Sequence, residues 1–309
     1  MEHRWIGGIE VSVVGIGCSN FGVRLDQEQS TAVVTSALDA GITLFDTADL
    51  YGGTTSEVLL GRALGGRRGE AVIATKFGLP HGDEPGGGAP DYVRRSCEGS
   101  LRRLGTETID LFQLHAPDAS VPLAETLGAM AALVDEGKVR ALGCSNFTAD
   151  ELCHARSLGL PGFSSVQNQY SLLWREPERE VLGALDELDM TLLPYYPLAN
   201  GLLTGKYAKG RELPEGARIS LMPAERTAHW MSDALLDVVE QLRTIAAQVE
   251  IPMATLAFSW LASHPRVASV IAGASNPAQV EANASAVTIL SAEVIARLEA
   301  ATASLVAPA

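Results

Sequence analysis

The chain has 309 residues, 47% of them hydrophobic and 19% charged, which is enough for a sizeable core and excludes bulk disorder. Its 37 acidic residues exceed its 23 basic ones, and the formal net charge of −14 argues against nucleic acid or an anionic membrane as a partner. The sequence contains neither a signal-peptide pattern nor 18 consecutive apolar residues, so we expect a cytoplasmic protein.

The four cysteines, Cys18, Cys97, Cys144 and Cys153, form no CxxC pair and no metal-ligand spacing with histidine. We therefore expect free thiols in a reducing compartment and no bound metal.

Short β-branched runs recur along the chain, and an amphipathic stretch follows most of them. The predicted strands are residues 13–17, 42–45, 71–75, 109–114, 139–144, 164–166, 190–193 and 267–272. The predicted helices are residues 27–40, 56–64, 92–104, 123–136, 149–157, 177–188, 233–249, 255–263, 277–286 and 292–304. Strand starts between residues 42 and 190 lie 25 to 38 residues apart, which is the length of one βα unit.

Eight such units in one domain, residues 1–309, fit a (β/α)₈ TIM barrel, and a doubly wound open sheet is the alternative. Residues 9–14 precede the first unit and are expected to form half of a β-hairpin that caps the barrel. Residues 81–90 and 199–230 are predicted to be long irregular loops on the C-terminal face, where barrels carry their ligand contacts.

Two polar residues are expected to begin helices. Thr148 and Glu151 form a capping-box pattern, and Asp91 is expected to cap the helix that starts at residue 92.

Three familiar motifs are incomplete. Gly15-Ile-Gly17 lacks the last glycine of a dinucleotide fingerprint and opens no helix directly. The run from Gly201 to Tyr207 is one residue short of a phosphate loop and has Tyr207 where a magnesium-binding hydroxyl belongs. No GxSxG motif is present, so a Rossmann enzyme, a nucleoside triphosphatase and a serine hydrolase are all disfavoured.

Polar side chains follow three neighbouring predicted strands. Asp46 ends the second strand and Tyr51 lies just beyond it, while Lys76 and His115 end the third and fourth. A barrel would bring these four to one mouth, although each alone is more often a structural or packing residue.

This set has a specific chemistry. A nearby ammonium, from Lys76 paired with Asp46, would lower the pKa of the Tyr51 phenol and favour its use as an acid–base group. His115 would orient a substrate oxygen, and Tyr51 would protonate a carbonyl as hydride reaches its carbon.

At these residues the sequence resembles the aldo-keto reductase family, and the resemblance covers essentially the whole chain. The matching segments are Asp46-Thr-Ala-Asp-Leu-Tyr-Gly52, Leu60-Gly-Arg-Ala-Leu64, Ala74-Thr-Lys-Phe-Gly78, Asp110-Leu-Phe-Gln-Leu-His115, Gly143-Cys-Ser-Asn-Phe147, Gln167-Asn-Gln-Tyr170, the run from Tyr195 to Lys206, and the run from Gly273 to Gln279. The family is a (β/α)₈ barrel that usually binds NADPH without a Rossmann fold.

The resemblance implies an NADP-dependent oxidoreductase that reduces aldehydes or ketones to alcohols, with a catalytic tetrad of Asp46, Tyr51, Lys76 and His115. It implies a cofactor site made by Cys18, Ser19, Asp46, Ser145, Asn146, Gln167, Tyr195, Tyr196, Pro197, Leu198, Gly201, Leu202, Thr204, Lys206, Gly273, Ser275, Gln279 and Asn283. Ser145, Asn146 and Gln167 would hold the nicotinamide carboxamide, and Tyr195 would stack on the ring. Residues 196–206 would surround the pyrophosphate, and residues 273–283 the adenosine.

The sequence departs from the family near the adenosine. Ser275 and Asn276 are neutral where many members carry a basic residue, so Arg218 or Lys206 must grip the 2′-phosphate of NADP. Tyr196 replaces a common serine, so its backbone rather than its side chain is expected to face the pyrophosphate.

Phe21, Leu50, Phe77 and Trp174 are candidate substrate-pocket residues, and they suggest an apolar or aromatic-tolerant cleft for a small carbonyl substrate. A cofactor-binding sensor or regulatory subunit is the alternative function, and a barrel lyase that uses Lys76 as a Schiff-base amine is a third. We expect a monomer or a small homo-oligomer.

Overall fold

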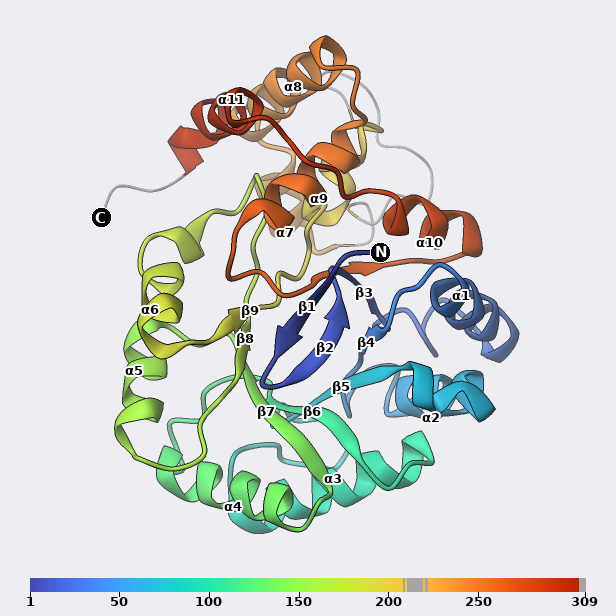
Figure 1. Ribbon diagram of the computed structural model, residues 1–309, viewed down its shortest axis with the longest axis vertical. Coiled ribbons are helices and arrows are strands. Elements are labelled where there is room, and N and C mark those ends of the chain that lie inside the picture. The colour runs from blue at the N-terminus through green and yellow to red at the C-terminus, as the bar shows by residue number, and fades with distance from the viewer. Residues whose placement is uncertain (208, 210–218, 220–221, 306–309) are drawn as a thin grey trace.

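An eight-stranded parallel sheet forms the centre of the molecule, described here from a computed structural model (Figure 1). The structure describes residues 1–207, 209, 219 and 222–305. The strands follow one another in the order β10-β3-β4-β5-β6-β7-β8-β9. Their bounds are β3 Val14–Gly17, β4 Leu44–Asp46, β5 Val72–Phe77, β6 Ile109–Leu114, β7 Val139–Ser145, β8 Ser165–Gln167, β9 Thr191–Leu192 and β10 Val270–Gly273.

The two edges of this sheet meet, which makes it a barrel. Isolated parallel bridges join Leu192 to Val267 and Tyr195 to Ile271, next to β9 and β10. The backbone N–H of Ile271 donates to the carbonyl of Pro194 across the same seam at 3.0 Å. The predicted (β/α)₈ fold is therefore confirmed.

An antiparallel hairpin of β1 (His3–Ile6) and β2 (Ile9–Ser12) covers the N-terminal end of the barrel (Figure 1). Its buried residues Ile6, Ile9 and Val11 form one apolar cluster with barrel residues such as Leu44 and Leu111. The expected hairpin is present, although its second strand stops at Ser12 and Val14 already belongs to β3.

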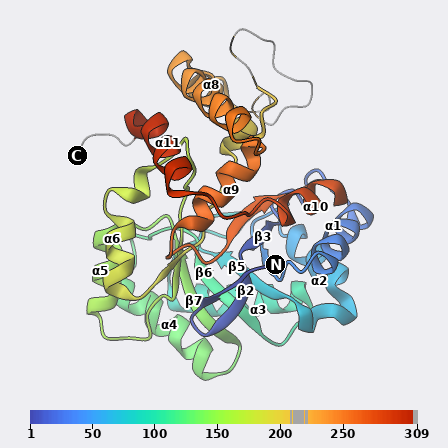
Figure 2. The ribbon, with the colours of Figure 1, turned by 45° about the horizontal axis from the view of Figure 1, so that its top comes forward.

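Helices surround the barrel, and two of them, residues Asp233–Gln248 and Ala292–Thr302, pack on each other at one side of it (Figures 1 and 2). Their bounds are α1 Gln27–Asp39, α2 Thr55–Leu64, α3 Pro90–Leu104, α4 Leu123–Asp135, α5 Ala149–Ser157, α6 Val181–Leu188, α7 Ala224–Trp230, α8 Asp233–Gln248, α9 Met253–Ser263, α10 Pro277–Ala284 and α11 Ala292–Thr302. Short 3₁₀ segments cover Gly65–Glu70, Glu176–Glu178, Ala199–Thr204 and Ala303–Leu305.

Most helix bounds lie within two residues of the prediction, with two exceptions, and one predicted cap is wrong. The helix expected from residue 177 begins only at Val181, behind a 3₁₀ turn, and residues 224–230 form α7 inside a segment expected to be irregular. Asp91 is not an N-cap, because the rigid ring of Pro90 already occupies the first helical position and Ala89 precedes it. Thr148 and Glu151 do form the predicted capping box at α5.

Within the described part of the chain, no helix by itself is long and apolar enough to cross a membrane. Among the described residues, α8 and α9 taken together reach the required length and composition, but the chain bends by 94° at their junction.

Candidate active site

Four polar side chains meet at the C-terminal ends of β4, β5 and β6. Asp46 is the last residue of β4, Lys76 is the last but one of β5, and His115 directly follows β6. Tyr51 lies in the turns between β4 and α2. Since neighbouring parallel strands end at the same edge, the barrel brings these residues together as the sequence predicts.

Lys76 lies at the centre of this group and is fully buried. Its Nζ donates to Asp46 Oδ2 at 2.7 Å, to the carbonyl of Thr47 at 2.9 Å and to the Tyr51 hydroxyl at 3.4 Å. The rings of Tyr51 and His115 meet edge to face, with their centroids 5.9 Å apart. A phenol, an ammonium and an imidazole thus face one small volume.

The protonation states of these groups follow from burial and from their charged neighbours. Burial raises the pKa of Tyr51, and this outweighs the lowering by Lys76, so the sequence-based expectation of a lowered value is wrong. Burial opposes the charge on Lys76, but Asp46 and Tyr51 raise its pKa above the ordinary value. Burial and then the Lys76 charge lower the pKa of His115 to about 3. At neutral pH the site therefore holds a protonated phenol, an ammonium and a neutral imidazole.

Two amides hold the Asp46 carboxylate from the side opposite Lys76. Gln167 Nε2 donates to Asp46 Oδ1 at 2.8 Å, and Gln113 Nε2 approaches the same oxygen at 3.4 Å. Gln113 was not among the predicted site residues. Its signal was a polar side chain inside the otherwise largely apolar run of β6, where it is fully buried.

The residues predicted around a nicotinamide lie together at the ends of β7 and β8 and just beyond β9. Ser145 Oγ donates to the carbonyl of Gln167 at 2.7 Å, and Asn146 Nδ2 donates to the carbonyl of His115 at 2.9 Å. Tyr195 donates its hydroxyl to Asn146 Oδ1 at 2.9 Å. The bond of Asn146 to His115, and that of Gln167 to Asp46, connect this group directly to the four polar residues that include Lys76.

The segment after β9 has an unusual backbone. Tyr196, Ala199, Asn200 and Gly201 all adopt positive φ values, and a 3₁₀ segment continues to Thr204. A Cβ atom at Gly201 would lie 3.3 Å from Lys206 Nζ, so the absence of a side chain leaves room for that ammonium. Pro197 and Leu202 are buried, Leu198 is half-buried, and Thr204 and Lys206 are exposed. Successive backbone amides in such conformations form concave anion sites.

The residues predicted to hold adenosine surround the start of α10. Asn276 caps this helix by accepting from the N–H of Gln279 at 3.0 Å, and Gln279 Oε1 accepts from the N–H of Ser275 at 2.8 Å. Asn283 is buried, and its Nδ2 has no hydrogen-bond partner among the residues that the structure describes. Gly273 is exposed at the end of β10.

Other candidate residues are less accessible than expected. Cys18 is fully buried, and its thiol lies 3.8 Å from the carbonyl of Ile16. Phe21 and Phe77 have no exposed surface, and Phe77 stacks on Phe112, so both pack in the core and do not line an open cleft.

The remaining predicted residues are half-buried or exposed, except for one that lies outside the described part of the chain. Ser19 and Leu50 are half-buried, and Trp174, 36% exposed, packs against His229 and Trp230. Arg218 lies outside the described residues. No group of three or more His, Cys, Asp or Glu side chains suited to a metal ion is present in the described parts of the chain.

Comparison with known proteins identifies the class. The model of the aldo/keto reductase family matches residues 13–303. A probable voltage-gated potassium channel subunit beta from Oryza sativa subsp. japonica is 34% identical over 97% of this chain and 96% of its own length.

Two solved structures resemble the whole chain. The holo form of aldo-keto reductase AKR11C1 from Bacillus halodurans is 31% identical, with a TM-score of 0.81 over 97% of this chain and 96% of that one. Glycerol dehydrogenase AKR11B4 from Gluconobacter oxydans is 28% identical, with a TM-score of 0.86 over 99% and 97%.

The barrel and its matches define an oxidoreductase family of the TIM-barrel class whose members bind nicotinamide cofactors. The chain belongs to the aldo/keto reductase family.

Proposed function

We propose that this protein catalyses the reversible, NADP-dependent reduction of an aldehyde or ketone to the alcohol, with Tyr51 as the general acid and base. The observation that carries the proposal is the position of the Lys76 ammonium between the Asp46 carboxylate and the Tyr51 hydroxyl, at 2.7 and 3.4 Å. His115 lies beside Tyr51 and completes the tetrad.

Tyr51 is suited to give a proton to a carbonyl oxygen. Its raised pKa keeps the proton on the phenol at neutral pH, and the Lys76 ammonium stabilises the phenolate that remains after transfer. Neutral His115 is able to donate a hydrogen bond that orients the same oxygen without adding charge. In the reverse direction the phenolate takes the alcohol proton.

The predicted cofactor residues fit a nicotinamide dinucleotide in three places. Ser145, Asn146 and Gln167 provide amide and hydroxyl groups beside the tetrad. The positive-φ backbone near Gly201, with Lys206 next to it, provides a cradle for a pyrophosphate. When bound, the cofactor supplies the hydride that the carbonyl carbon gains, while the oxygen gains the proton of Tyr51.

The unsatisfied Asn283 amide supports an adenosine end at α10, where a hydrogen-bond acceptor on the base would complete it. NADP is proposed over NAD with Arg218 as the group that grips the 2′-phosphate, because Ser275 and Asn276 offer no charge there.

Replacing Tyr51 by Phe tests the catalytic assignment. We expect kcat for reduction of 4-nitrobenzaldehyde to fall about 10²- to 10⁴-fold, since the proton donor is lost. The Kd for NADPH, measured by fluorescence titration, should stay within about twofold because the phenol hydroxyl is not a predicted cofactor contact. Activity that survives in Tyr51→Phe contradicts the role of Tyr51.

A cofactor-binding sensor is the second candidate, because one relative that matches along nearly its whole length is named a probable channel subunit beta. Single-turnover oxidation of bound NADPH by 4-nitrobenzaldehyde separates the two functions. Tight NADPH binding without oxidation would favour the sensor.

The lyase alternative finds less support in the geometry. The ion pair with Asp46 keeps Lys76 protonated, whereas a Schiff-base lysine must be a free amine.

A further inference from the structure

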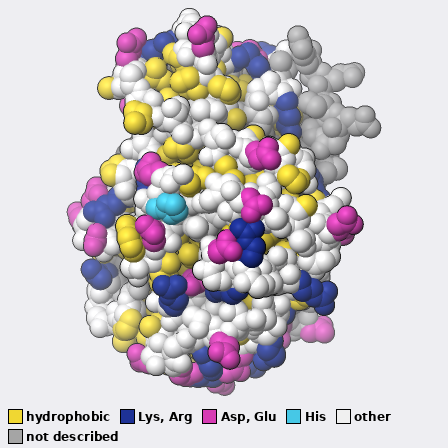
Figure 3. Space-filling view, turned by 45° about the vertical axis from the view of Figure 1, so that its right-hand side comes forward, with side chains coloured by type: hydrophobic (Ala, Val, Ile, Leu, Met, Phe, Trp, Pro, Cys, Tyr) yellow, Lys and Arg dark blue, Asp and Glu magenta, His cyan; other side chains and the backbone are white. Residues whose placement is uncertain are grey.

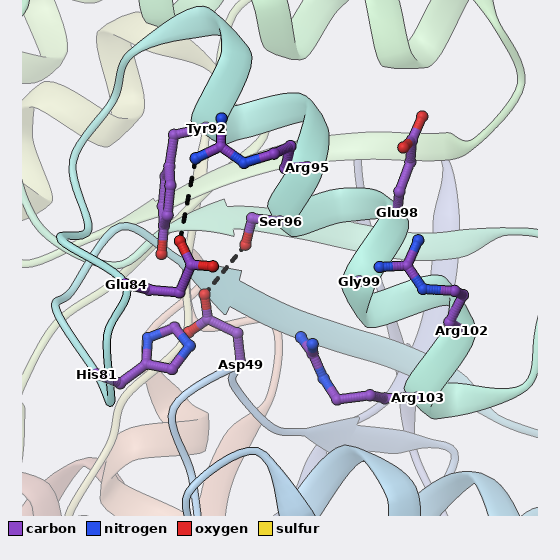
Figure 4. A pocket seen from close by; sticks show the side chains of 10 residues that line it. All are labelled: Asp49, His81, Glu84, Tyr92, Arg95, Ser96, Glu98, Gly99, Arg102 and Arg103. Atoms are coloured by element: carbon purple, nitrogen blue, oxygen red, sulfur yellow. Dashed lines mark hydrogen bonds and ion pairs between the residues drawn. The ribbon is translucent and has the colours of Figure 1, made fainter.

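A pocket of about 360 Å³ lies between the loop that carries Tyr51 and helix α3 (Figure 4). It is lined by Asp49 from that loop, by His81 and Glu84 from the loop after β5, and by residues of α3 such as Tyr92 and Ser96. None of these residues has a role in the proposed chemistry. Asp49 is separated from Tyr51 by only one residue, so the pocket reaches the catalytic loop.

Asp49 connects that loop to two other elements. Its backbone N–H donates to the carbonyl of Lys76 on β5 at 3.0 Å. Its Oδ2 accepts a hydrogen bond from Ser96 Oγ on α3 at 3.0 Å, as the dashed line in Figure 4 marks. Within the loop, the N–H of Tyr51 donates to the carbonyl of Ala48 at 3.2 Å. The position of Asp49 therefore determines where the turn that presents Tyr51 can lie.

The second carboxylate oxygen of Asp49 has no hydrogen-bond partner among the described residues. The residue is 1% exposed, so this oxygen, Oδ1, is buried. The Tyr92 hydroxyl, in the same pocket, is also buried and has no partner in the described part of the chain. Buried polar groups are normally satisfied by protein or by water, so water that enters this pocket would satisfy both groups and would carry protons to Asp49.

Charged groups of three elements surround Asp49. His81 faces it from the loop after β5, Glu57 from α2 and Arg103 from α3. Arg103 is engaged by Glu57, to which its Nε donates at 2.6 Å. Glu84 also lines the pocket, 4.0 Å from Arg95.

We propose that Asp49 is a positioning residue for Tyr51, and that protonation of its carboxyl group through this pocket loosens the catalytic loop and slows carbonyl reduction. The inference rests on the proposed function. A carboxylate accepts a hydrogen bond about twice as strongly as a neutral carboxyl group, so the Ser96 anchor weakens when Asp49 gains a proton.

The pH at which this happens follows from the surroundings of Asp49. Burial raises its pKa to about 6, and Glu57 acts in the same direction, while His81, Ser96 and Arg103 lower it. Asp49 is thus mostly ionised at pH 7.5 and mostly neutral at pH 5. Reduction by the wild type should accordingly slow as the pH falls through about 6.

The experiment compares kcat against pH, from about pH 5 to 8, for the wild type and three variants at saturating NADPH and 4-nitrobenzaldehyde. Asp49→Asn should lack the fall near pH 6 and should be about tenfold slower than the wild type at pH 7.5, because a displaced proton donor reacts slowly. Its Kd for NADPH should equal that of the wild type. The proposal is overturned if kcat of the wild type does not fall near pH 6, or if kcat of Asp49→Asn does fall there.

Histidine also titrates in this range, so His81→Gln distinguishes the two groups. Loss of the His81 charge should move the fall to higher pH, since that charge lowers the pKa of Asp49. Disappearance of the fall in His81→Gln would assign the titration to His81 and overturn the proposal. Glu98→Gln is the matched control, because Glu98 lines the same pocket from α3 and should leave the profile unchanged.

A wild type that reduces no carbonyl at any pH would contradict the proposed function, and a second measurement then decides the role of Asp49. Amide hydrogen exchange of residues 46–56 at pH 7.5 should be faster in Asp49→Asn than in the wild type and in Glu98→Gln. If the exchange rates are equal in all three proteins, Asp49 does not anchor the loop that carries Tyr51.

Discussion

The imidazole of His115 shows how burial selects one protonation state. The ring is only 9% exposed and lies near the Lys76 ammonium, which disfavours a second positive charge. Its Nδ1 has no hydrogen-bond partner within the described residues. A neutral ring with one free donor or acceptor is therefore the form available to a ligand.

We predict that His115 stays neutral down to about pH 5. Its ring resonances in NMR should not shift between about pH 8 and pH 5, whereas the histidines of the urea-unfolded protein should titrate at about pH 6.5. A transition of the His115 resonance near pH 6.5 in the folded protein would contradict this.

The same difference affects stability. Below about pH 6.5 the unfolded chain binds a proton at His115, whereas the folded protein does not. The free energy of unfolding therefore decreases at this residue as the pH falls toward 3.

Among the elements, α5 has the clearest local signal. Thr148 Oγ1 accepts from the N–H of Glu151, and Glu151 Oε2 accepts from the N–H of Thr148 at 2.8 Å, so two backbone groups at the helix start are satisfied. Both side chains of this capping box lie within four consecutive residues, so the helix start could be predicted from the sequence. Asp91 was also expected to cap a helix, without such a reciprocal partner, but Pro90 occupies the first helical position before it.

Thr148→Ala should lower the free energy of unfolding by about 1 kcal/mol and the melting temperature by a few degrees, measured by calorimetry, because the cap is lost. Thr244→Ala is a suitable control. Its hydroxyl bonds to the carbonyl of Glu240 inside α8, where alanine is the better helix former. If the two variants lose equal stability, the cap makes no special contribution.

For the molecule as a whole, the net charge of −14 says little about the proposed site. Figure 3 shows acidic and basic side chains mixed over one face rather than gathered by sign. The proposed cofactor is itself an anion, so its binding has to depend on local groups such as Lys206 and the amides near Gly201.

Cofactor binding should stabilise the folded protein by mass action. NADPH at about 100 times its Kd should add about 2.7 kcal/mol to the free energy of unfolding, and NADH at the same concentration should add less. Arg218→Ala should reduce the shift in melting temperature caused by NADPH and leave that caused by NADH nearly unchanged. An equal reduction for both would contradict the role of Arg218 at the 2′-phosphate.

Local sequence patterns were sufficient to predict that the polar residues at the strand ends come together. Asp46, Lys76 and His115 end successive parallel strands, and a barrel necessarily brings such ends to one mouth. The start of α5 and the N-terminal hairpin were likewise encoded by residues close together in the chain.

The tertiary structure alone determined the pKa values, burial and side-chain contacts that depend on residues far apart in the sequence. Burial and a charged partner set the pKa of Tyr51, and packing against Phe112 turned Phe77 toward the core. The contact of Asp49 with Ser96, 47 residues further along the chain, has no local signal. The strand–helix pattern and the polar residues at the strand ends determined the barrel and its candidate chemistry. Side-chain packing determined the electrostatics, because desolvation depends on atoms that the chain brings together only by folding.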